Sequence, residues 1–474
     1  MKLIFDINDK PKFSQIIVFA FQQMLAIMAA TLLVPMIVST DTFTMDPAAA
    51  LAGAGIGTLV YLFFTKRKSP VFRGSSVAFL GAMGTAVAAG YGYWGLIIGA
   101  LIAGLVYVVI AIVIHYTGTG WVNKLLPAVV IGPTVALIGL GLSGTATNWL
   151  MGNGADLVKN PEAYNLVTIL VGLVTFIVIV LASAKGNKTM KMIPFIIGIG
   201  SGYVFALLLT VIGTVAGVPE LCVLDWSSIV NCFSTFTFKS IFSIPGFTVV
   251  EGIKTGFSAI DGAAIGNIAV AFAPVAFVVL AEHIADHKNI SSIIERDLLK
   301  DPGLTRTLLG DGVGSMVGAI FGGCPNTTYG ESVGCVAITK NASIITIFAA
   351  AIGCIVLSFF SPFVAVINSI PKCVMGGACI ALYGFIAVSG LQMLKNVDLG
   401  DTKNLFVVSS ILVCGIGGLV INIDIGAANP LTITNVATAL ILGIIVNTIL
   451  SAGKKANTHE SVENLSVVSE EENK

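Results

Sequence analysis

The stretch that decides the fold reads Gly322-Gly323-Cys324-Pro325-Asn326-Thr327-Thr328-Tyr329-Gly330-Glu331-Ser332-Val333-Gly334 and lies between the apolar runs 313–321 and 342–359. A carboxylate costs about 2.5 kcal/mol or more at the centre of a bilayer. The proline and the glycines around it break helical geometry, and broken backbone at membrane depth is tolerated only where protein buries it or where it lines a cavity. The stretch therefore predicts a transporter's substrate site, made of free backbone amides and the Glu331 carboxylate. In the alternative interpretation, Glu331 binds neighbouring amides and only stabilises the break.

The composition indicates a membrane protein. The mean hydropathy of the 474 residues is +0.95, and 11% of them are charged, against about 25% in soluble domains. The net charge is zero and no basic patch stands out, so nucleic acid is not an expected partner. No Cys/His cluster suggests a metal or cofactor, and no nucleophile–base set suggests an enzyme.

The apolar runs predict an all-α polytopic fold. At about 20 residues per span, we count about fourteen transmembrane segments. The first seven lie near 15–38, 49–65, 72–88, 93–115, 123–143, 165–184 and 190–216, and the second seven near 262–283, 304–322, 326–339, 342–367, 373–394, 404–421 and 429–452. The third and tenth are short and interrupted by glycine and proline at corresponding places of the two halves, which is typical of an inverted-repeat transporter.

Two pairs of similar segments support the division into two halves. Gly74-Ser75-Ser76-Val77 after Pro70 resembles Gly330-Glu331-Ser332-Val333 after Pro325, and Pro127-Ala128-Val129-Val130-Ile131-Gly132 resembles Pro371-Lys372-Cys373-Val374-Met375-Gly376. The similar segments follow the same order in each half. Because each half holds an odd number of spans, the second repeat would be inverted relative to the first.

The distribution of lysine and arginine predicts that both termini are cytoplasmic. We expect a cytoplasmic N-terminus at 1–14, a first seven-span repeat at 15–216, an extracellular loop at 217–261, a second repeat at 262–452 and a disordered, acidic cytoplasmic tail at 453–474. The outer loop carries Cys222 and Cys232. The oxidising side of the membrane permits a disulfide between them, but two free thiols are the favoured alternative.

Several other polar residues lie in or beside apolar runs. Glu282 ends the run 268–281, as a second substrate ligand or as an acid reaching the interface. His283, Asp286 and His287 are assigned by spacing to the cytoplasmic end of that span, since Lys288 follows at once. We expect Arg73 to reach the cytoplasm beside Lys66-Arg67-Lys68 rather than to bind an anion. Gln22 and Gln23 either contact the site or join helices, and Tyr329 and Tyr383 either stack on a planar ligand or pack in the interior.

At Pro325-Asn326-Thr327-Thr328-Tyr329-Gly330-Glu331 the chain resembles the nucleobase–ascorbate transporter family, and its bacterial uracil permeases in particular. The likeness runs from about residue 12 to 452 and includes Ala281-Glu282-His283, Asp297-Leu298-Leu299-Lys300-Asp301-Pro302-Gly303-Leu304, Gly74-Ser75-Ser76, Met375-Gly376-Gly377 and Leu382-Tyr383-Gly384. The purine branch of the family typically has Gln-Asn where this chain has Pro325-Asn326.

The resemblance implies a core domain of spans 1–4 and 8–11, a gate domain of spans 5–7 and 12–14, and short β-strands in spans 3 and 10. It implies that Glu282 and Glu331 bind the substrate, that Val77 and Gly330 contribute backbone amides, and that Ala30, Tyr329 and Tyr383 pack around the base. It assigns proton coupling to Glu282, with Asp286 and His287 beside it.

The resemblance implies import of uracil by proton symport across the plasma membrane. Xanthine or urate is the alternative substrate and Na⁺ the alternative ion, and a homodimer is left open. Three residues depart from the family pattern. Gln23 stands where many relatives have His, Asp286 where some permeases have His, and Arg73 where permeases commonly have an apolar residue.

Overall fold

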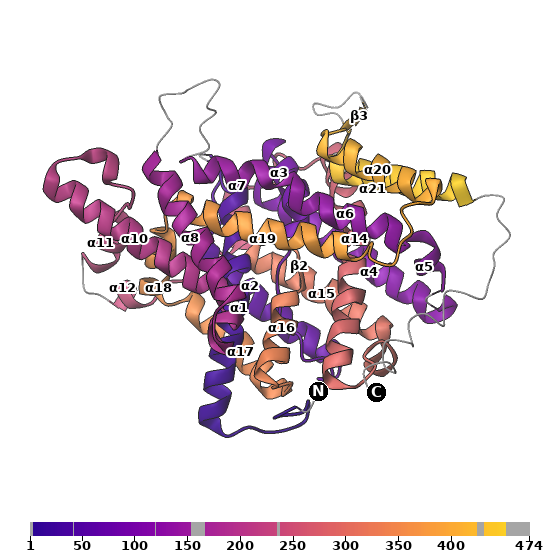
Figure 1. Cartoon of the computed structure of the whole chain (residues 1–474), viewed down its shortest axis with the longest axis horizontal. Helices are drawn as coiled ribbons and strands as arrows, with labels where there is room; N and C mark the ends of the chain where they lie inside the picture. Colours follow the sequence, from indigo (N-terminus) through magenta and orange to yellow (C-terminus); the bar gives the residue numbers. More distant parts are fainter. Residues whose placement is uncertain are drawn as a thin grey trace.

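The structure is a computed structural model that describes residues 3–40, 42–118, 120–152, 166–234, 238–423 and 431–451. The expected tail at 453–474 lies outside these ranges. The chain is mostly helical, and its long helices cross one another in two groups (Figure 1).

The first half of the chain forms helices and one short strand. These elements are α1 (Phe13–Val38), α2 (Pro47–Phe64), β1 (Arg73–Ser75), the 3₁₀ turn η1 (Val77–Phe79), α3 (Leu80–Ala88), α4 (Gly92–Thr117), α5 (Gly120–Leu125), α6 (Ala128–Gly141), α7 (Ser143–Leu150), α8 (Leu166–Ala184), α9 (Lys188–Met192) and α10 (Pro194–Ala216). The connection to the second half holds η3 (Pro219–Leu221), α11 (Ser227–Phe233), α12 (Phe238–Ile241) and α13 (Thr248–Thr255).

The second half has a related order. Its elements are α14 (Gly262–Ile294), η4 (Leu299–Gly303), α15 (Leu304–Gly322), β2 (Asn326–Thr328), α16 (Gly330–Thr339), α17 (Ile344–Ser358), α18 (Ser361–Asn368), α19 (Lys372–Gln392), α20 (Thr402–Ile416), β3 (Ile421–Ile423), β4 (Leu431–Ile433) and α21 (Asn435–Ser451).

Polar caps mark where several helices begin. The Asp46 carboxylate accepts a hydrogen bond from the amide of Ala48, and Pro47 occupies the first position of α2. Asp261 caps α14 in the same way and Asp401 caps α20. Each cap satisfies an amide that has no partner inside its own helix.

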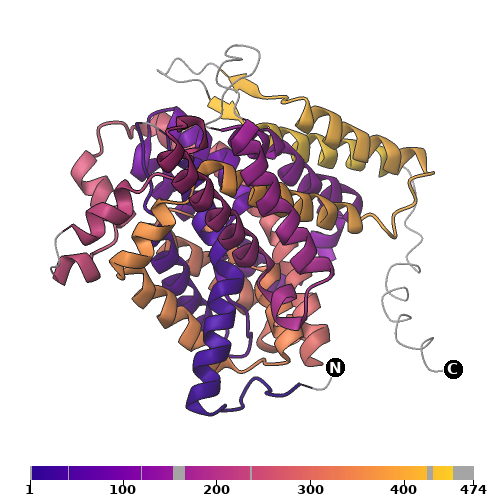
Figure 2. The same ribbon diagram turned by 60° about the vertical axis from the view of Figure 1, so that its left-hand side comes forward.

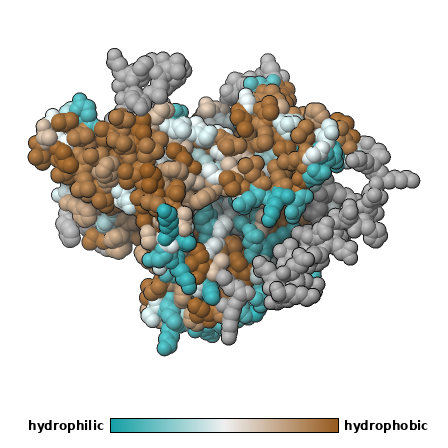
Figure 3. All heavy atoms as spheres, viewed as in Figure 1, coloured by the Kyte–Doolittle hydropathy of each residue, from teal (hydrophilic) through white to brown (hydrophobic). Residues whose placement is uncertain are grey.

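The outer surface has the character expected of a membrane protein. Eight helices among the described residues are long and apolar enough to span a bilayer, and four further apolar helices are shorter. Large hydrophobic side chains remain exposed on many of them, for example Val413 at 70% and Leu208 at 56%. Hydrophobic residues cover most of the face seen in Figure 3. The protein is therefore a multi-pass membrane protein.

The helices pack in two groups. In one group, α15 packs against α2 and α4, α17 against α1 and α2, and α14 against α4. In the other, α19 packs against α6, α7 and α8, α10 against α8, and α20 against α6 and α21. The pair formed by α20 and α21 lies together at one side of the molecule in both ribbon views (Figures 1 and 2).

Glycines allow α2 and α15 to approach closely. A Cβ at Gly53 would lie 2.4 Å from the Gly318 carbonyl oxygen, and a Cβ at Gly318 would lie 2.8 Å from the Gly53 carbonyl oxygen. The side chain of Asn326 enters the same interface, where its Nδ2 donates to the Gly53 carbonyl at 3.0 Å. Small residues four apart are the usual means of close helix packing in membranes. This contact anchors β2 to the pair of helices.

Two short strands pair within the group of helices that contains α2, α14 and α15. β1 and β2 pair antiparallel, with Arg73 opposite Thr328 and Ser75 opposite Asn326. Both strands are buried throughout. A half-helix follows each strand, η1–α3 after β1 and α16 after β2. The broken spans predicted near 72–88 and 326–339 are thus strand–helix units that pair through their strands.

Several predicted boundaries change. The segment predicted at 262–283 is a helix of 33 residues that continues to Ile294, and the segment predicted at 342–367 is divided into α17 and α18. A β-hairpin of β3 and β4 joins α20 to α21 and was not predicted.

Of the two alternatives for Cys222 and Cys232, the structure has the free thiols. The Cys222 Sγ lies 3.8 Å from the Thr210 carbonyl oxygen, and the Cys232 Sγ lies 3.3 Å from that of Ser240. The two thiols thus face different parts of the protein. Proximity in sequence does not bring them together, since Cys222 directly follows η3 whereas Cys232 lies within α11.

Candidate functional site

A cavity of about 490 Å³ lies between the two groups of helices. Its walls come from α1, η1, α14, β2 and α16 on one side and from α6, α9, α10 and α19 on the other. Ala30, Val77, Tyr329, Gly330, Glu331, Glu282 and Asp286 all line it. Most residues predicted for the site therefore meet in one place, although they come from four separate parts of the sequence.

Glu331 lies in the first turn of α16, and Gly330 is the first residue of that helix. The first amides of a helix lack intrahelical partners and carry partial positive charge. The space beside Gly330 is open, with Asp286 Oδ1 as the nearest atom to a Cβ placed there, at 3.8 Å. This end of α16 therefore presents amide donors and one carboxylate to the cavity.

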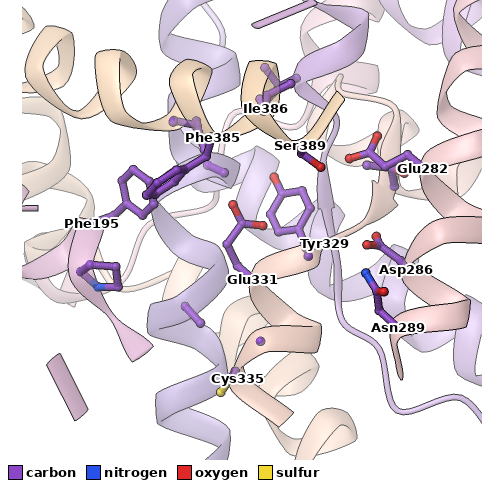
Figure 4. Close-up of a pocket in the computed structure, with 18 of the residues that line it drawn as sticks. Phe195, Glu282, Asp286, Asn289, Tyr329, Glu331, Cys335, Phe385, Ile386 and Ser389 are labelled. Atoms are coloured by element: carbon purple, nitrogen blue, oxygen red, sulfur yellow. The ribbon is translucent and has the colours of Figure 1, made fainter. Parts of the chain in front are cut away.

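Tyr329 fixes one wall of the cavity. Its hydroxyl donates to the Ser75 carbonyl at 2.6 Å, which ties the ring to the end of β1. A Cβ at Gly74 would lie 2.5 Å from this ring, so only glycine leaves room for it. In Figure 4 the Tyr329 ring lies between Glu331 on one side and Glu282 and Asp286 on the other. The ring is thus held where a planar ligand between the acids would meet it.

The acids on α14 form the opposite wall. Glu282 and Asp286 are four residues apart and lie on one face of the helix, and both line the cavity. The Thr328 hydroxyl donates to Asp286 Oδ2 at 2.8 Å. Asn289 continues the same face (Figure 4). Three carboxyl groups therefore line a cavity that is otherwise mostly apolar, although Asn289 and Lys191 also reach it.

The structure buries the three residues that spacing assigned to the cytoplasmic end of the span, His283, Asp286 and His287. The two histidines are fully buried and Asp286 is 7% exposed. The helix continues past them to Ile294, and Lys288 beside them is exposed on another face. Asp286 faces the cavity, whereas His287 points away from it to Tyr61, whose hydroxyl lies 2.6 Å from its Nε2.

Tyr383 is buried but does not line the cavity. On the same helix, Phe385, Ile386 and Ser389 reach the cavity wall instead (Figure 4). Gln23 also lies outside the cavity and donates to the Ser332 hydroxyl, which joins α1 to the first turn of α16. The interpretation of Gln23 as a residue that joins helices is therefore the one that fits the structure.

Arg73 does not reach the cytoplasm, so that prediction is wrong. Its side chain is fully buried and forms an ion pair with Asp311 on α15. The physical reason is that β1 pairs with β2 in the protein interior, which carries Arg73 away from the exposed residues Lys66, Arg67 and Lys68.

Asp311 was missed at the sequence level. A signal was present, because Asp311 lies inside the apolar run 304–322, where an acid is costly. Thr328, Asn289 and Ser389 carried no such signal, since single hydroxyl and amide side chains are common in membrane helices.

Comparisons with known proteins agree with this architecture. A model of a permease family matches residues 14–423. The chain is 38% identical to the uracil permease of Bacillus caldolyticus, over 98% of this chain and 99% of that protein. It is 36% identical to the uracil permease of Bacillus subtilis strain 168, over 97% and 98%, and 33% identical to that of Escherichia coli K12, over 92% of each.

Two solved structures share the fold. The transmembrane domain of a cyanobacterium bicarbonate transporter, BicA, superposes with a TM-score of 0.60 at 13% identity, over 93% of this chain and 98% of that chain. The murine Solute Carrier 26 family member A9 anion transporter in the inward-facing state also gives 0.60, at 11% identity, over 93% and 69%. At such low identity the likeness concerns the fold alone.

Proposed function

Because the chain belongs to the permease family, the nucleobase–ascorbate transporters, we propose that it imports uracil in symport with protons. One observation carries this proposal. Glu331 at the start of α16 and Glu282 and Asp286 on α14 surround one cavity, with Tyr329 between them. The relatives named uracil permease, which align over nearly the whole chain, support the choice of uracil.

The residue types suit this substrate. Uracil is a planar ring with N–H donors and C=O acceptors. The carboxylates of Glu331 and Glu282 would accept from the N–H groups, and the free amides at Val77 and Gly330 would donate to the carbonyl groups. A site built for a given pattern of donors rejects analogues that leave its own polar groups unpaired. Ala30 and Tyr329 would pack on the faces of the ring.

Proton coupling would use the acids themselves. A carboxyl group enclosed by protein can bind a proton with the substrate and release both when the site opens to the other side. Glu282 is the favoured carrier, and Asp286 is placed to share the proton, four residues away on the same face. His287 and Tyr383 keep only indirect roles in this proposal, since neither lines the cavity.

The orientation proposed from the sequence makes this state inward-open. The cavity reaches Lys191 and Met192 on α9, Asn289 near the end of α14, and Ile338 near the end of α16. In the proposed topology these positions are cytoplasmic, with both termini inside the plasma membrane.

We further propose that the fourteen segments form two inverted repeats, with the group containing α14 and α15 as the core domain and the group containing α6 and α19 as the gate domain. A homodimer and Na⁺ coupling are not required by this scheme. The segment at 217–261, which holds α11 to α13, would be the extracellular connection between the halves.

Transport by purified protein in vesicles tests the function. Labelled uracil should accumulate when the outside is more acidic than the inside, because protons that enter with uracil drive it inward. Raising the external pH from about 6 to 8, or adding a protonophore, should lower accumulation tenfold or more, since one pH unit is worth about 1.4 kcal/mol per proton. Accumulation that depends on a sodium gradient and not on pH would show that the coupled ion is Na⁺ rather than a proton.

A purine is the second candidate, because a cavity of about 490 Å³ leaves room for a ring system larger than uracil. A competition panel with uracil, thymine, xanthine and urate separates the two. Uracil should be the strongest competitor. Stronger inhibition by xanthine or urate would assign the chain to purine transport.

A further inference from the structure

Arg73 is the only lysine or arginine that is buried among the residues whose side chains the structure describes, and its exposed fraction is zero. It does not line the cavity. A guanidinium enclosed in protein without partners would be very costly, so its contacts determine what it does.

Arg73 joins both strands to α15. Its Nη2 forms an ion pair with Asp311 and also donates to the Asn326 carbonyl on β2 at 2.5 Å. Its Nη1 donates to the Gly310 carbonyl at 3.3 Å. A Cβ at Gly314 would lie 2.2 Å from Nη1, so α15 has room for the guanidinium only because this residue is glycine.

Two routes of contacts lead from Arg73 to the acids of the cavity. Across the strand pair, Arg73 is opposite Thr328, whose hydroxyl donates to Asp286 Oδ2 at 2.8 Å. Through the ion pair, Arg73 reaches Asp311, whose Oδ2 accepts from His283 Nδ1 at 2.9 Å. His283 directly follows Glu282 on α14. Each route therefore ends beside a carboxyl group that lines the cavity.

We propose that Arg73 is a positioning residue of the uracil site: its guanidinium holds β2 and α14 at the separation at which Glu282 can bind the base with Asp286 beside it. The identity of the base rests on the function proposed above, whereas the geometric part does not. The competing explanation is that Arg73 only compensates the buried charge of Asp311 and leaves the cavity unaffected.

The variant Arg73→Lys separates these explanations. Lysine keeps the positive charge and so compensates Asp311, but its ammonium lacks the planar fork that bonds Asp311 and two carbonyls at once. We expect a melting temperature near that of the wild type and a uracil Kd about tenfold higher, as for the loss of one charge-assisted hydrogen bond. The matched control is Arg306→Lys, an exposed arginine of the same helix as Asp311, which should bind as the wild type does.

A double variant that removes both charges keeps the proposal testable if the lysine variant does not fold. Arg73→Met together with Asp311→Asn removes both charges, and Asp311→Asn alone completes the cycle. We expect the double variant to fold yet to bind uracil more weakly than Asp311→Asn alone. A wild-type Kd in folded Arg73→Lys, or equal Kd values in the double variant and Asp311→Asn, would overturn the proposal.

Hydrogen exchange decides the geometric part without any substrate. In folded Arg73→Lys, the peptide spanning residues 322–336 should exchange faster than in the wild type, because β2 loses a bond that holds it to α15. A peptide from α20 should not change. Unchanged exchange across 322–336 would overturn the inference even if uracil proves not to be the substrate, whereas failure of the wild type to bind uracil would overturn only the proposed function.

Discussion

Glu331 and Glu282 line the same cavity from different kinds of position, so their neutral variants should fail in different ways. Glu331 belongs to the first turn of α16, where its carboxylate and the free amides face the cavity together. Glu282 lies in the middle of the long helix α14, with Asp286 one turn away. In the proposed function the first acid is a substrate ligand and the second also carries the proton.

For Glu331→Gln we expect uracil binding to weaken by about tenfold to a hundredfold, because an anionic acceptor is replaced by a group that is half donor. Equilibrium binding to the purified variant measures this, with its melting temperature as the check on folding. Glu220→Gln, an exposed acid of η3, is the control and should bind normally. A wild-type Kd for Glu331→Gln would remove Glu331 from the site.

For Glu282→Gln we expect accumulation against a gradient to be lost while exchange of labelled for unlabelled uracil continues at a reduced rate. An amide cannot bind and release a proton in this range of pH, so uptake loses its driving force but the base can still be carried. Vesicle assays with and without an imposed pH gradient measure both activities. If Glu282→Gln concentrated uracil as well as the wild type does, the proton would have to travel on another group.

The sequence predicted which residues line the cavity better than it predicted the buried charged residues that lie behind the cavity wall. Glu331 and Gly330 could be assigned because a broken, acid-bearing span has few physical explanations. Arg73 was assigned wrongly, since the sequence does not reveal that β1 lies inside the protein. The burial of His283 could not be foreseen either, because it depends on contact with Asp311 of α15. Their partner Asp311 becomes meaningful only once α15 is packed against both.

At the scale of elements, the strand pair depends on the close contact between α2 and α15. A Cβ at Gly318 would lie 2.3 Å from the Asn326 Nδ2 and 2.8 Å from the Gly53 carbonyl oxygen. We therefore expect Gly318→Val to displace β2 and to destabilise the protein by about 1–3 kcal/mol or more, the usual cost of overpacking. Thermal unfolding in detergent and uracil uptake should both decline.

Gly200→Val is the matched control for this change. Gly200 is exposed in α10, and nothing lies within 4 Å of a Cβ placed there. It should unfold and transport as the wild type does. Equal stability of the Gly318 and Gly200 variants would contradict the packing argument.

The ends of uniformly apolar helices such as α2 and α4 were predicted to within a few residues, because length and hydropathy alone define such helices. The division between α17 and α18 could not be predicted in this way, since the apolar run continues through the break. The hairpin of β3 and β4 was missed for the same reason. Its first residue, Ile421, ends the apolar span predicted at 404–421.

At the scale of the whole molecule, the cavity lies between two groups of helices and most of its polar groups come from one of them. Val77, Glu282, Tyr329 and Glu331 belong to the group of α14 and α16, whereas α6 and α19 supply mainly apolar side chains such as Val135, Ile138 and Phe385. A base held mainly by one group can move with it past the other without losing its polar contacts. This asymmetry favours movement of the proposed core against the proposed gate.

Cysteine pairs that join α14 to α6, which contact each other, test this movement in a background in which the eight native cysteines are replaced. Cross-linking should stop uracil transport, because the site could no longer reach the other side, yet uracil should still bind with a Kd within a fewfold of the uncross-linked protein. Reduction of the cross-link should restore transport. A control pair within one group, between α2 and α15, should leave transport intact, since those helices move together. Full transport by a protein that is quantitatively cross-linked between α14 and α6 would mean that the two groups do not move apart, and that the base leaves the cavity by a smaller local opening.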